Sequence, residues 1–223
     1  MFMSERGECS QNSKHNKMVK WGVRMIDVCY QKRKNVWYSA AAQDNQVLAT
    51  DFSFEEPHLR RLLRKLPYDI LFQVTEEPNQ LLANVLNALE EIFNGKDRES
   101  YGFKTCVDHL SSYTRKVLNC TRLVPVGYVT TYGAIAKAVG GIARSVGRVE
   151  ASNPVPLLIP CHRVVCSDLG IGGYGYGEQV KMELLQREER GYEESTRLRV
   201  DERELALFPA KWVKQKHGEL LRG

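Results

Sequence analysis

The tetrapeptide Asn153-Pro154-Val155-Pro156 places the strongest constraint on the local fold of this 223-residue chain. Each proline disfavours helical backbone at the residue before it, so the segment is predicted to be extended. Residues 130–139, just before it, are typical of a short helix capped by Thr130 or Thr131. Gly140-Gly141 ends that helix, and residues 142–151 begin another. The sequence therefore predicts two short helices followed by an extended segment.

Two short helices separated by a glycine-containing turn are typical of a helix-turn-helix, the motif that places its second helix against DNA. An ordinary hairpin of two helices has the same pattern, and spacing alone slightly favours it. Both interpretations stay open on the residues by themselves.

The first half of the chain predicts a small α/β domain over residues 1–104, beginning with a loose polar arm over residues 1–20. The clearest element is a helix over residues 78–93, because seven apolar side chains fall on one face and Asn94-Gly95-Lys96 follows. Before it, the pattern predicts strands at 36–42 and 46–54 joined by a turn at 43–45, a helix at 55–66 and a strand at 68–74.

The second half changes character after about residue 103, and a second domain is predicted over residues 105–192, with a C-terminal extension over 193–223. Further predicted elements are a helix at 111–121, a turn at 124–127 and a helix at 181–190. The extension is charged and no role is assigned to it; its candidate anchors are Leu205, Leu207, Phe208, Trp212 and Val213.

The basic residues are concentrated in one region. The whole chain carries 32 Lys+Arg against 27 Asp+Glu, a formal charge of +5. Between Tyr113 and Arg163, however, seven residues are basic and only Glu150 is acidic. A polyanion such as DNA would bind there.

Several classes of protein do not fit the composition. The chain has no apolar run of the length that a transmembrane helix requires, and Met-Phe-Met-Ser-Glu-Arg-Gly-Glu is not a secretory signal. We therefore expect an intracellular protein without membrane association. The six cysteines are too scattered for a disulfide scaffold and form no CxxC pair, so we expect free thiols and no metal site.

The candidate nucleophile is Cys161, which an apolar run delivers between Pro160 and His162. A thiol must become a thiolate to attack carbon, so it needs a base. Adjacent residues of a regular strand point to opposite faces, but a turn at Pro160 would let the imidazole approach the sulfur. Either Glu188 or Glu189 could orient the imidazole, and spacing does not choose between them. A lone buried cysteine is more often inert core.

The residues around Cys161 resemble the O6-alkylguanine-DNA alkyltransferases. The motif Pro-Cys-His-Arg at 160–163 matches their active-site sequence. Other matches are Val124-Pro125-x-Gly-x-Val-Thr-Thr-Tyr-Gly, Arg144-Ser-Val-Gly, Asn153-Pro-x-Pro and Gly172-Gly-Tyr. The resemblance covers about residues 105–190, and the first hundred residues fit the family only in size and class.

The resemblance implies a role for each matched residue of the reaction centre. Cys161 is the alkyl acceptor, and His162 removes its proton through water. Glu188 rather than Glu189 orients His162. Asn153 ties the two-helix motif to the active-site loop, and Tyr174 donates a hydrogen bond toward O6 of guanine.

The resemblance also implies how DNA is handled. The damaged guanine must rotate out of the duplex to reach a buried sulfur. Tyr132 would crowd the 3′ phosphate and promote rotation, and Arg144 would fill the vacated space. Two further DNA contacts are assigned to Gly133 and Ser167, and the base pocket to Pro156, Val164 and Gly175.

Together these matches imply an α/β (α+β) fold, with a small RNase H-like N-terminal domain and a helical, winged helix-turn-helix-type domain that holds the cysteine. The implied activity is irreversible, single-turnover DNA repair at O6-alkylguanine, with O4-alkylthymine as a further candidate substrate. It needs no cofactor. We expect a monomer bound to the minor groove of double-stranded DNA, in the cytoplasm of a prokaryote or the nucleus of a eukaryote.

The chain also departs from the family pattern. The turn between the two short helices is about two residues shorter than in many members. Arg148 stands where a small residue is usual, and is a candidate phosphate contact, whereas Glu150 is unfavourable beside phosphates. Gly175 replaces a common serine, and Tyr176 alters the pocket mouth. Cys166 is interpreted as core rather than as a redox partner of Cys161.

Three other functions compete with alkyl transfer. A Cys-His-Glu hydrolase would use the same activation, but no other oxyanion motif is recognisable. A DNA-binding module without transfer activity, whether a transcription regulator or an alkyltransferase-like protein, is disfavoured because such relatives lack the acceptor cysteine. A bifunctional regulator would need a cysteine cluster that the N-terminal half does not have.

Overall fold

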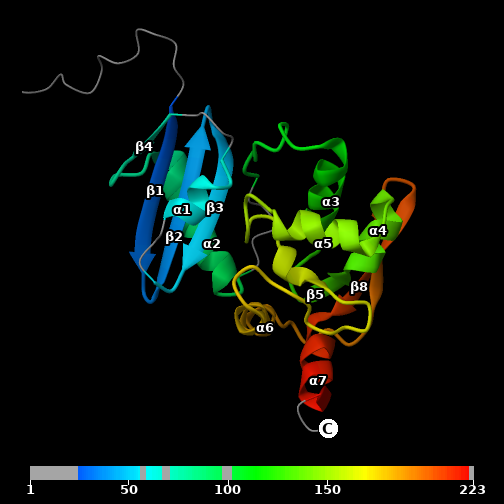
Figure 1. The fold of residues 1–223 in the computed structure, drawn as a ribbon. Helices are drawn as coiled ribbons and strands as arrows, with labels where there is room; N and C mark the ends of the chain where they lie inside the picture. Colours follow the sequence, from blue (N-terminus) through cyan, green and yellow to red (C-terminus); the bar gives the residue numbers. More distant parts are fainter. Residues whose placement is uncertain (1–24, 56–58, 67–70, 97–101, 221–223) are drawn as a thin grey trace, which may run out of the picture.

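The structure is a computed structural model that describes residues 25–55, 59–66, 71–96 and 102–220. The predicted N-terminal arm therefore lies outside the described residues, as does part of the predicted segments 55–66 and 68–74. Figure 1 shows two parts, an N-terminal sheet with its helices and a more helical part that continues to the C-terminus. The α/β expectation is confirmed at this level.

The N-terminal part is a mixed four-stranded sheet of order β3-β2-β1-β4. Its strands are β1 (Ile26–Arg33), β2 (Val36–Gln43), β3 (Gln46–Ser53) and β4 (Phe72–Val74). The first three are antiparallel, and β4 runs parallel to β1. Asp44 and Asn45 adopt positive φ between β2 and β3, which confirms the predicted hairpin turn. Strand β1 was absent from the sequence-based prediction.

One helix covers each face of this sheet. Because strand side chains alternate between faces, Tyr38, Ala40 and Ala42 of β2 share one core cluster with α2 (Gln80–Phe93), whereas Ala41 joins another with Leu62. Leu62 belongs to α1 (Leu59–Leu63), which ends three residues before the predicted end of the helix at residue 66. The predicted helix over residues 78–93 is confirmed as α2, capped by Asn79.

The second part begins with three helices, α3 (Ser112–Arg122), α4 (Tyr132–Val139) and α5 (Ala143–Ala151). The predicted start of α4 was wrong, because residues 130 and 131 belong to strand β5 (Tyr128–Thr131). Thr131 nevertheless caps α4 by accepting the Ala134 N–H at 3.0 Å. The helix ends at Gly140, as predicted.

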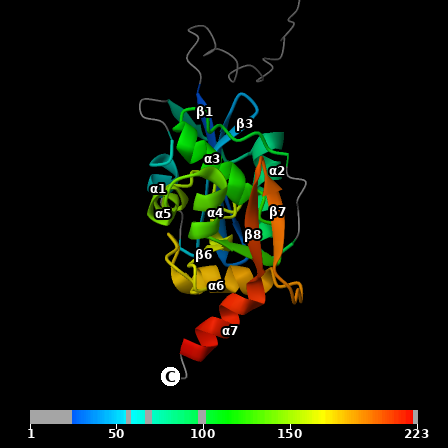
Figure 2. The ribbon, with the colours of Figure 1, turned by 90° about the vertical axis from the view of Figure 1, so that its right-hand side faces the viewer.

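Strand β5 lies inside a second sheet of order β6-β5-β8-β7. Its partners are β6 (Val164–Val165), which is parallel, and β8 (Arg203–Pro209), which pairs on the other side and is hairpin-linked to β7 (Thr196–Val200). The C-terminal extension thus completes this sheet, and α7 (Ala210–Leu220) continues from β8 (Figure 2). Helix α6 (Glu178–Arg187) begins and ends three residues earlier than the predicted helix. None of the helices in the described ranges is long and apolar enough to cross a membrane.

Candidate active site

The candidate nucleophile lies on a tight turn rather than on a strand. Cys161–Arg163 form one turn of 3-10 helix, closed by the Arg163 N–H donating to the Pro160 carbonyl at 2.8 Å. Strand β6 follows directly. The backbone turn expected at Pro160 is therefore confirmed, and Cys161 and His162 are not constrained to opposite faces of a sheet. Both side chains are buried.

Glu188 binds both residues that follow the cysteine. Its Oε1 lies 2.9 Å from Nε2 of His162, and Arg163 donates to both carboxylate oxygens at 2.8 Å. Burial alone would raise the pKa of Glu188, but the charges and hydrogen bonds of His162 and Arg163 lower it to about 2. Glu189 is exposed. Of the two glutamates that spacing left open, Glu188 is the one brought to the imidazole.

The surroundings select one form of His162. Burial lowers its pKa, although the adjacent Glu188 opposes this, so the imidazole is neutral at pH 7. A neutral ring beside a carboxylate donates its Nε2–H and leaves Nδ1 as an acceptor. Nδ1 is buried and has no hydrogen-bond partner among the described residues. His162 is therefore arranged to receive a proton at Nδ1.

The Cys161 thiol is protonated at rest. Burial, assisted by the charge of Glu150, raises its pKa to about 11, while Asn153, Lys181 and Lys65 lower it. A thiol with this pKa carries almost no thiolate at pH 7. It needs a base at the moment of attack, and the unpaired Nδ1 of the next residue can serve as one.

Asn153 holds the extended segment in front of the turn. It follows α5, accepts the Val155 N–H at 3.0 Å and donates to the Ile159 carbonyl at 2.9 Å. The two bonds close residues 153–159 into a loop that leads into Pro160. Pro156 is buried within this loop, and its carbonyl accepts a hydrogen bond from Thr50 of β3 at 2.8 Å.

The glycine-rich segment brings Tyr174 toward His162, with ring centroids 6.5 Å apart. Burial raises the pKa of Tyr174 well above its usual value, so its hydroxyl stays a donor. That hydroxyl is buried and finds no partner in the described part of the chain. Gly175 faces open space, whereas Val164 is a fully buried residue of β6.

The residues assigned to DNA contact lie on α4, α5 and the loop after β6. Tyr132 begins α4, and its hydroxyl donates to the Gly173 carbonyl at 3.5 Å. A Cβ on Gly133 would lie 3.4 Å from Oγ of Ser167, so these two are neighbours. Arg144 is separate from them, exposed in the first turn of α5, and Arg148 is exposed one turn later.

Comparison with known proteins identifies the group to which the chain belongs. Residues 112–190 match the sequence family described as 6-O-methylguanine DNA methyltransferase, DNA binding domain. A methylated-DNA--protein-cysteine methyltransferase of Methanocaldococcus vulcanius is 33% identical over 120 residues, which covers 52% of this chain and 73% of that protein. The chain belongs to this methyltransferase family.

Two further relatives extend the comparison. The human methylated-DNA--protein-cysteine methyltransferase is 46% identical over 80 residues, covering 34% of this chain and 39% of that protein. The crystal structure of the O6-methylguanine-DNA methyltransferase of Pyrococcus kodakaraensis aligns with a TM-score of 0.58 and 28% identity, over 74% of this chain and 99% of that one. The structural match therefore extends beyond the segment that the sequence family covers.

The structure of this methyltransferase corrects one expectation. Glu150 was expected beside phosphates, but it is buried and accepts a hydrogen bond from Oγ1 of Thr121 at 2.6 Å. Val146 and Val149 form the apolar face of α5, which packs toward α3 and α4. Glu150 is the third buried residue of this helix. Arg148 points to solvent and is free of this contact. Glu150 therefore belongs to the interior of the protein.

Two functional candidates escaped the sequence-based prediction. Lys181 is fully buried and donates to the Val164 carbonyl at 2.7 Å and the Gly173 carbonyl at 3.4 Å, joining the strand after the cysteine to the glycine-rich loop. Arg163 was quoted only as part of a motif, yet it supplies the charge that holds Glu188. A buried lysine in an otherwise ordinary amphipathic helix leaves no local signal.

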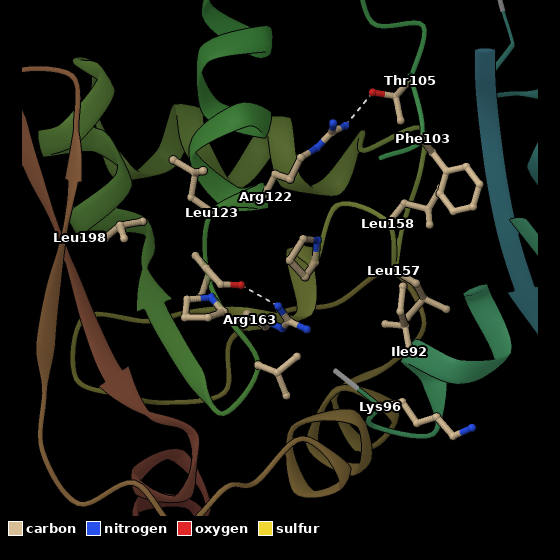
Figure 3. A pocket seen from close by; sticks show the side chains of 14 residues that line it. Ile92, Lys96, Phe103, Thr105, Arg122, Leu123, Leu157, Leu158, Arg163 and Leu198 are labelled. Carbon is tan, nitrogen blue, oxygen red and sulfur yellow. Dashed lines mark hydrogen bonds between the residues drawn. The ribbon is translucent and has the colours of Figure 1, made fainter. Parts of the chain in front are cut away.

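A cavity of about 340 Å³ borders the turn without containing the thiol (Figure 3). Its lining includes Pro160 and Arg163 but neither Cys161 nor His162. Arg163 donates there to the Val124 carbonyl, and Arg122 to Oγ1 of Thr105, both at 2.6 Å. The cavity is thus a neighbour of the active site rather than the active site. Within the described ranges, no three His, Cys, Asp or Glu residues form a metal site.

Proposed function

We propose that this protein repairs O6-alkylguanine in double-stranded DNA by direct reversal, moving the alkyl group irreversibly to Sγ of Cys161. Membership of the methylated-DNA--protein-cysteine methyltransferase family supports the reaction class. The observation that carries the assignment of residues is the unpaired Nδ1 of His162, whose ring Glu188 orients beside the cysteine.

The transfer needs one proton to leave the sulfur and one to reach guanine. His162 accepts the thiol proton at Nδ1, through water, and Glu188 stabilises the imidazolium that forms. The thiolate attacks the sp3 carbon, the S–C bond forms, and the C–O6 bond breaks with its electron pair on oxygen. Tyr174 donates a hydrogen bond toward O6, water supplies the proton that neutralises the departing guanine, and the imidazolium returns its proton to water. The stable thioether limits the protein to a single turnover, and no redox partner or cofactor is needed.

The proposed DNA complex follows the roles that the family resemblance implies. The pair α4–α5 acts as a helix-turn-helix in the minor groove, with Tyr132, Gly133 and Ser167 against the backbone and Arg144 in the duplex. Pro156, Val164 and Gly175 line the pocket for the extruded base. Residues 105–192 are the catalytic and DNA-binding domain, preceded by the N-terminal α/β domain of residues 1–104 and followed by the C-terminal extension of residues 193–223.

The protein acts as a monomer, since one thiol repairs one lesion. Its substrate places it inside the cell, in the cytoplasm of a prokaryote or the nucleus of a eukaryote. O4-alkylthymine is a second candidate substrate.

The direct test is the intact mass of the protein after incubation with a duplex that contains one O6-methylguanine. A gain of about 14 Da, one methyl group in place of one hydrogen, is expected on Cys161 and not in Cys161→Ala. Binding of the duplex without a change in mass would contradict the transfer. The protein would then be a lesion-binding module.

The role of Arg144 has a separate test. Arg144→Ala is expected to slow transfer from duplex DNA by about 10- to 100-fold, because a positioned group that fills the vacated space is lost. Transfer from the free base O6-methylguanine should be unchanged, since no base pair is opened. Arg148→Ala is the matched control and should alter mainly the salt dependence of binding. Equal losses on the duplex and on the free base would exclude a role in nucleotide rotation.

A further inference from the structure

The ring of Tyr176 is held by the N-terminal part of the chain, two residues after Tyr174. Phe52 of β3 stacks on it with ring centroids 4.0 Å apart and an interplanar angle of 12°. The guanidinium carbon of Arg61 lies 4.4 Å from the same ring centroid. Because the stacked Phe52 occupies one face, Arg61 contacts the other. Both faces of this ring are therefore covered by residues distant in sequence.

The hydroxyl of Tyr176 enters a network of charged side chains around the buried Asp51 carboxylate. It donates to Oδ1 of Asp51, whose carboxylate is buried. Lys65 donates to that oxygen at 3.1 Å and to the Tyr176 hydroxyl at 3.2 Å, and Arg61 binds the other carboxylate oxygen at 2.7 Å. Asp51, Arg61 and Lys65 form a cluster that we call the clamp. In the clamp, Oδ1 of Asp51 accepts the hydrogen bond of the Tyr176 hydroxyl, and such a bond depends on the direction of the hydroxyl group.

Strand β3, which carries Asp51, also contacts the loop of residues 153–159 that leads to Cys161. Thr50, the neighbour of Asp51, donates from its backbone N–H to the Pro154 carbonyl at 3.0 Å and from Oγ1 to the Pro156 carbonyl at 2.8 Å. Strand β3 is the edge of the N-terminal sheet that faces the rest of the chain (Figure 1). Consecutive residues of one strand thus contact both segments that flank Cys161.

Tyr176, which the clamp holds, is itself in contact with Tyr174. Their ring centroids are 5.2 Å apart, and Tyr174 in turn lies against His162. A Cβ at Gly173 or Gly175 would meet no atom within 4 Å, so the backbone on either side of Tyr174 has open space around it. The loop is otherwise held at the Gly173 carbonyl, by Lys181 and Tyr132. At its other end the Tyr174 carbonyl accepts the Gly177 N–H at 2.9 Å, and Tyr176 ties this end to the N-terminal part of the chain.

We propose that the clamp is a positioning device, which holds Tyr176 and through it the Tyr174 hydroxyl in the geometry required for alkyl transfer. This inference rests on the proposed function. It assigns the N-terminal part of the chain a contribution to the chemical step, separate from DNA binding. Asp51, Arg61, Lys65 and Tyr176 are positioning residues, since none of them is placed against the reacting atoms.

The test separates the rate of transfer from the affinity for DNA. Tyr176→Phe keeps the stacked ring and removes only the hydroxyl, with its bonds to Asp51 and Lys65. At saturating duplex its single-turnover rate is expected to fall about tenfold or more, because small misplacements of a catalytic group are costly, while the Kd for the duplex stays within about twofold. Asp51→Asn should act similarly, and the double variant should be no slower than the slower single one, since both changes break the same contact.

Glu90→Gln is the matched control. It breaks the Arg33–Glu90 ion pair, with N···O 3.0 Å, in the same N-terminal part but away from the loop, and its rate should equal that of the parent. The clamp variants should also be slow with free O6-methylguanine, in contrast to Arg144→Ala. A folded Tyr176→Phe protein that transfers as fast as an active parent would overturn the clamp alone. A parent protein that transfers no methyl group would overturn the proposed function and the clamp with it.

Discussion

The Glu188→Gln variant is expected to lose about 3–5 kcal/mol of stability and to transfer alkyl groups at least about 100-fold more slowly. Glu188 is buried between His162 and Arg163, and Arg163 binds it through two hydrogen bonds of 2.8 Å. Glutamine removes the negative charge and directs an N–H group at a guanidinium, so the buried charge of Arg163 loses its partner. It also removes the group that would stabilise a protonated imidazole.

Denaturant unfolding and single-turnover kinetics measure the two losses separately. The double variant Arg163→Met/Glu188→Gln is the informative control, because it removes both charges together. It should recover much of the stability while transfer stays slow. Recovery of the rate together with the stability would mean that Glu188 acts only through folding.

The pH dependence of stability provides a second test of the role of the Glu188 carboxylate. Its pKa in the folded protein is about 2, below the ordinary value of 4.5. A carboxyl group whose pKa is lowered by folding contributes stability to the folded protein. This contribution is complete above the pKa of the group in the unfolded chain, and it is lost as the pH falls toward its pKa in the folded protein. Glu188→Gln should therefore destabilise most at neutral pH and least near pH 2.

The second large effect is expected at Glu150, where replacing the carboxylate should raise the stability of the protein rather than lower it. Burial raises its pKa to about 7, against a hydrogen bond from Thr121 and the charge of Lys181. Between its ordinary pKa of 4.5 and about 7, the folded protein retains a proton that the unfolded chain has released. The free energy of unfolding therefore falls as the pH rises through this window. The buried Oε2, which has no partner in the described ranges, is consistent with this cost.

Glu150→Gln should accordingly stabilise the protein by about 2–3 kcal/mol above pH 7.5 and have little effect near pH 4.5. Urea unfolding at both pH values measures the difference, with the exposed Glu189→Gln as the control. Because Glu150 also raises the pKa of Cys161, the variant should release the thiol proton at lower pH. Equal stabilisation at both pH values would show that the pKa of Glu150 is not raised in the folded protein.

The elements that the sequence predicted well are those whose causes are local. Asn79 and Gly95 bound helix α2, and Asp44 and Asn45 make the β2–β3 turn, because capping and positive φ depend on the residues themselves. The resemblance similarly chose Glu188 as the partner of His162, which lies 2.9 Å from it, whereas the role of Cys161 as nucleophile stays a prediction.

The predictions failed where distant segments decide the structure. Residues 130 and 131 join a strand because they pair with Val164 and Val165 of β6, 34 residues later in each case. Strand β1 likewise lies between β2 and β4 and pairs with both of them. No spacing rule could place Lys181 or Glu150 in the interior, since their surroundings come from other elements.

By itself, the sequence determined the order of the main local elements and the chemistry available at Cys161-His162-Arg163. It carried no information on the charge state of these groups. Only the tertiary structure decided that Glu188 is buried between His162 and Arg163, that Nδ1 is left unpaired, and that Asp51 reaches the hydroxyl of Tyr176. The physical reason is that hydrogen bonding and pKa values depend on burial and on neighbours in space, and these neighbours are up to 125 residues apart along the chain.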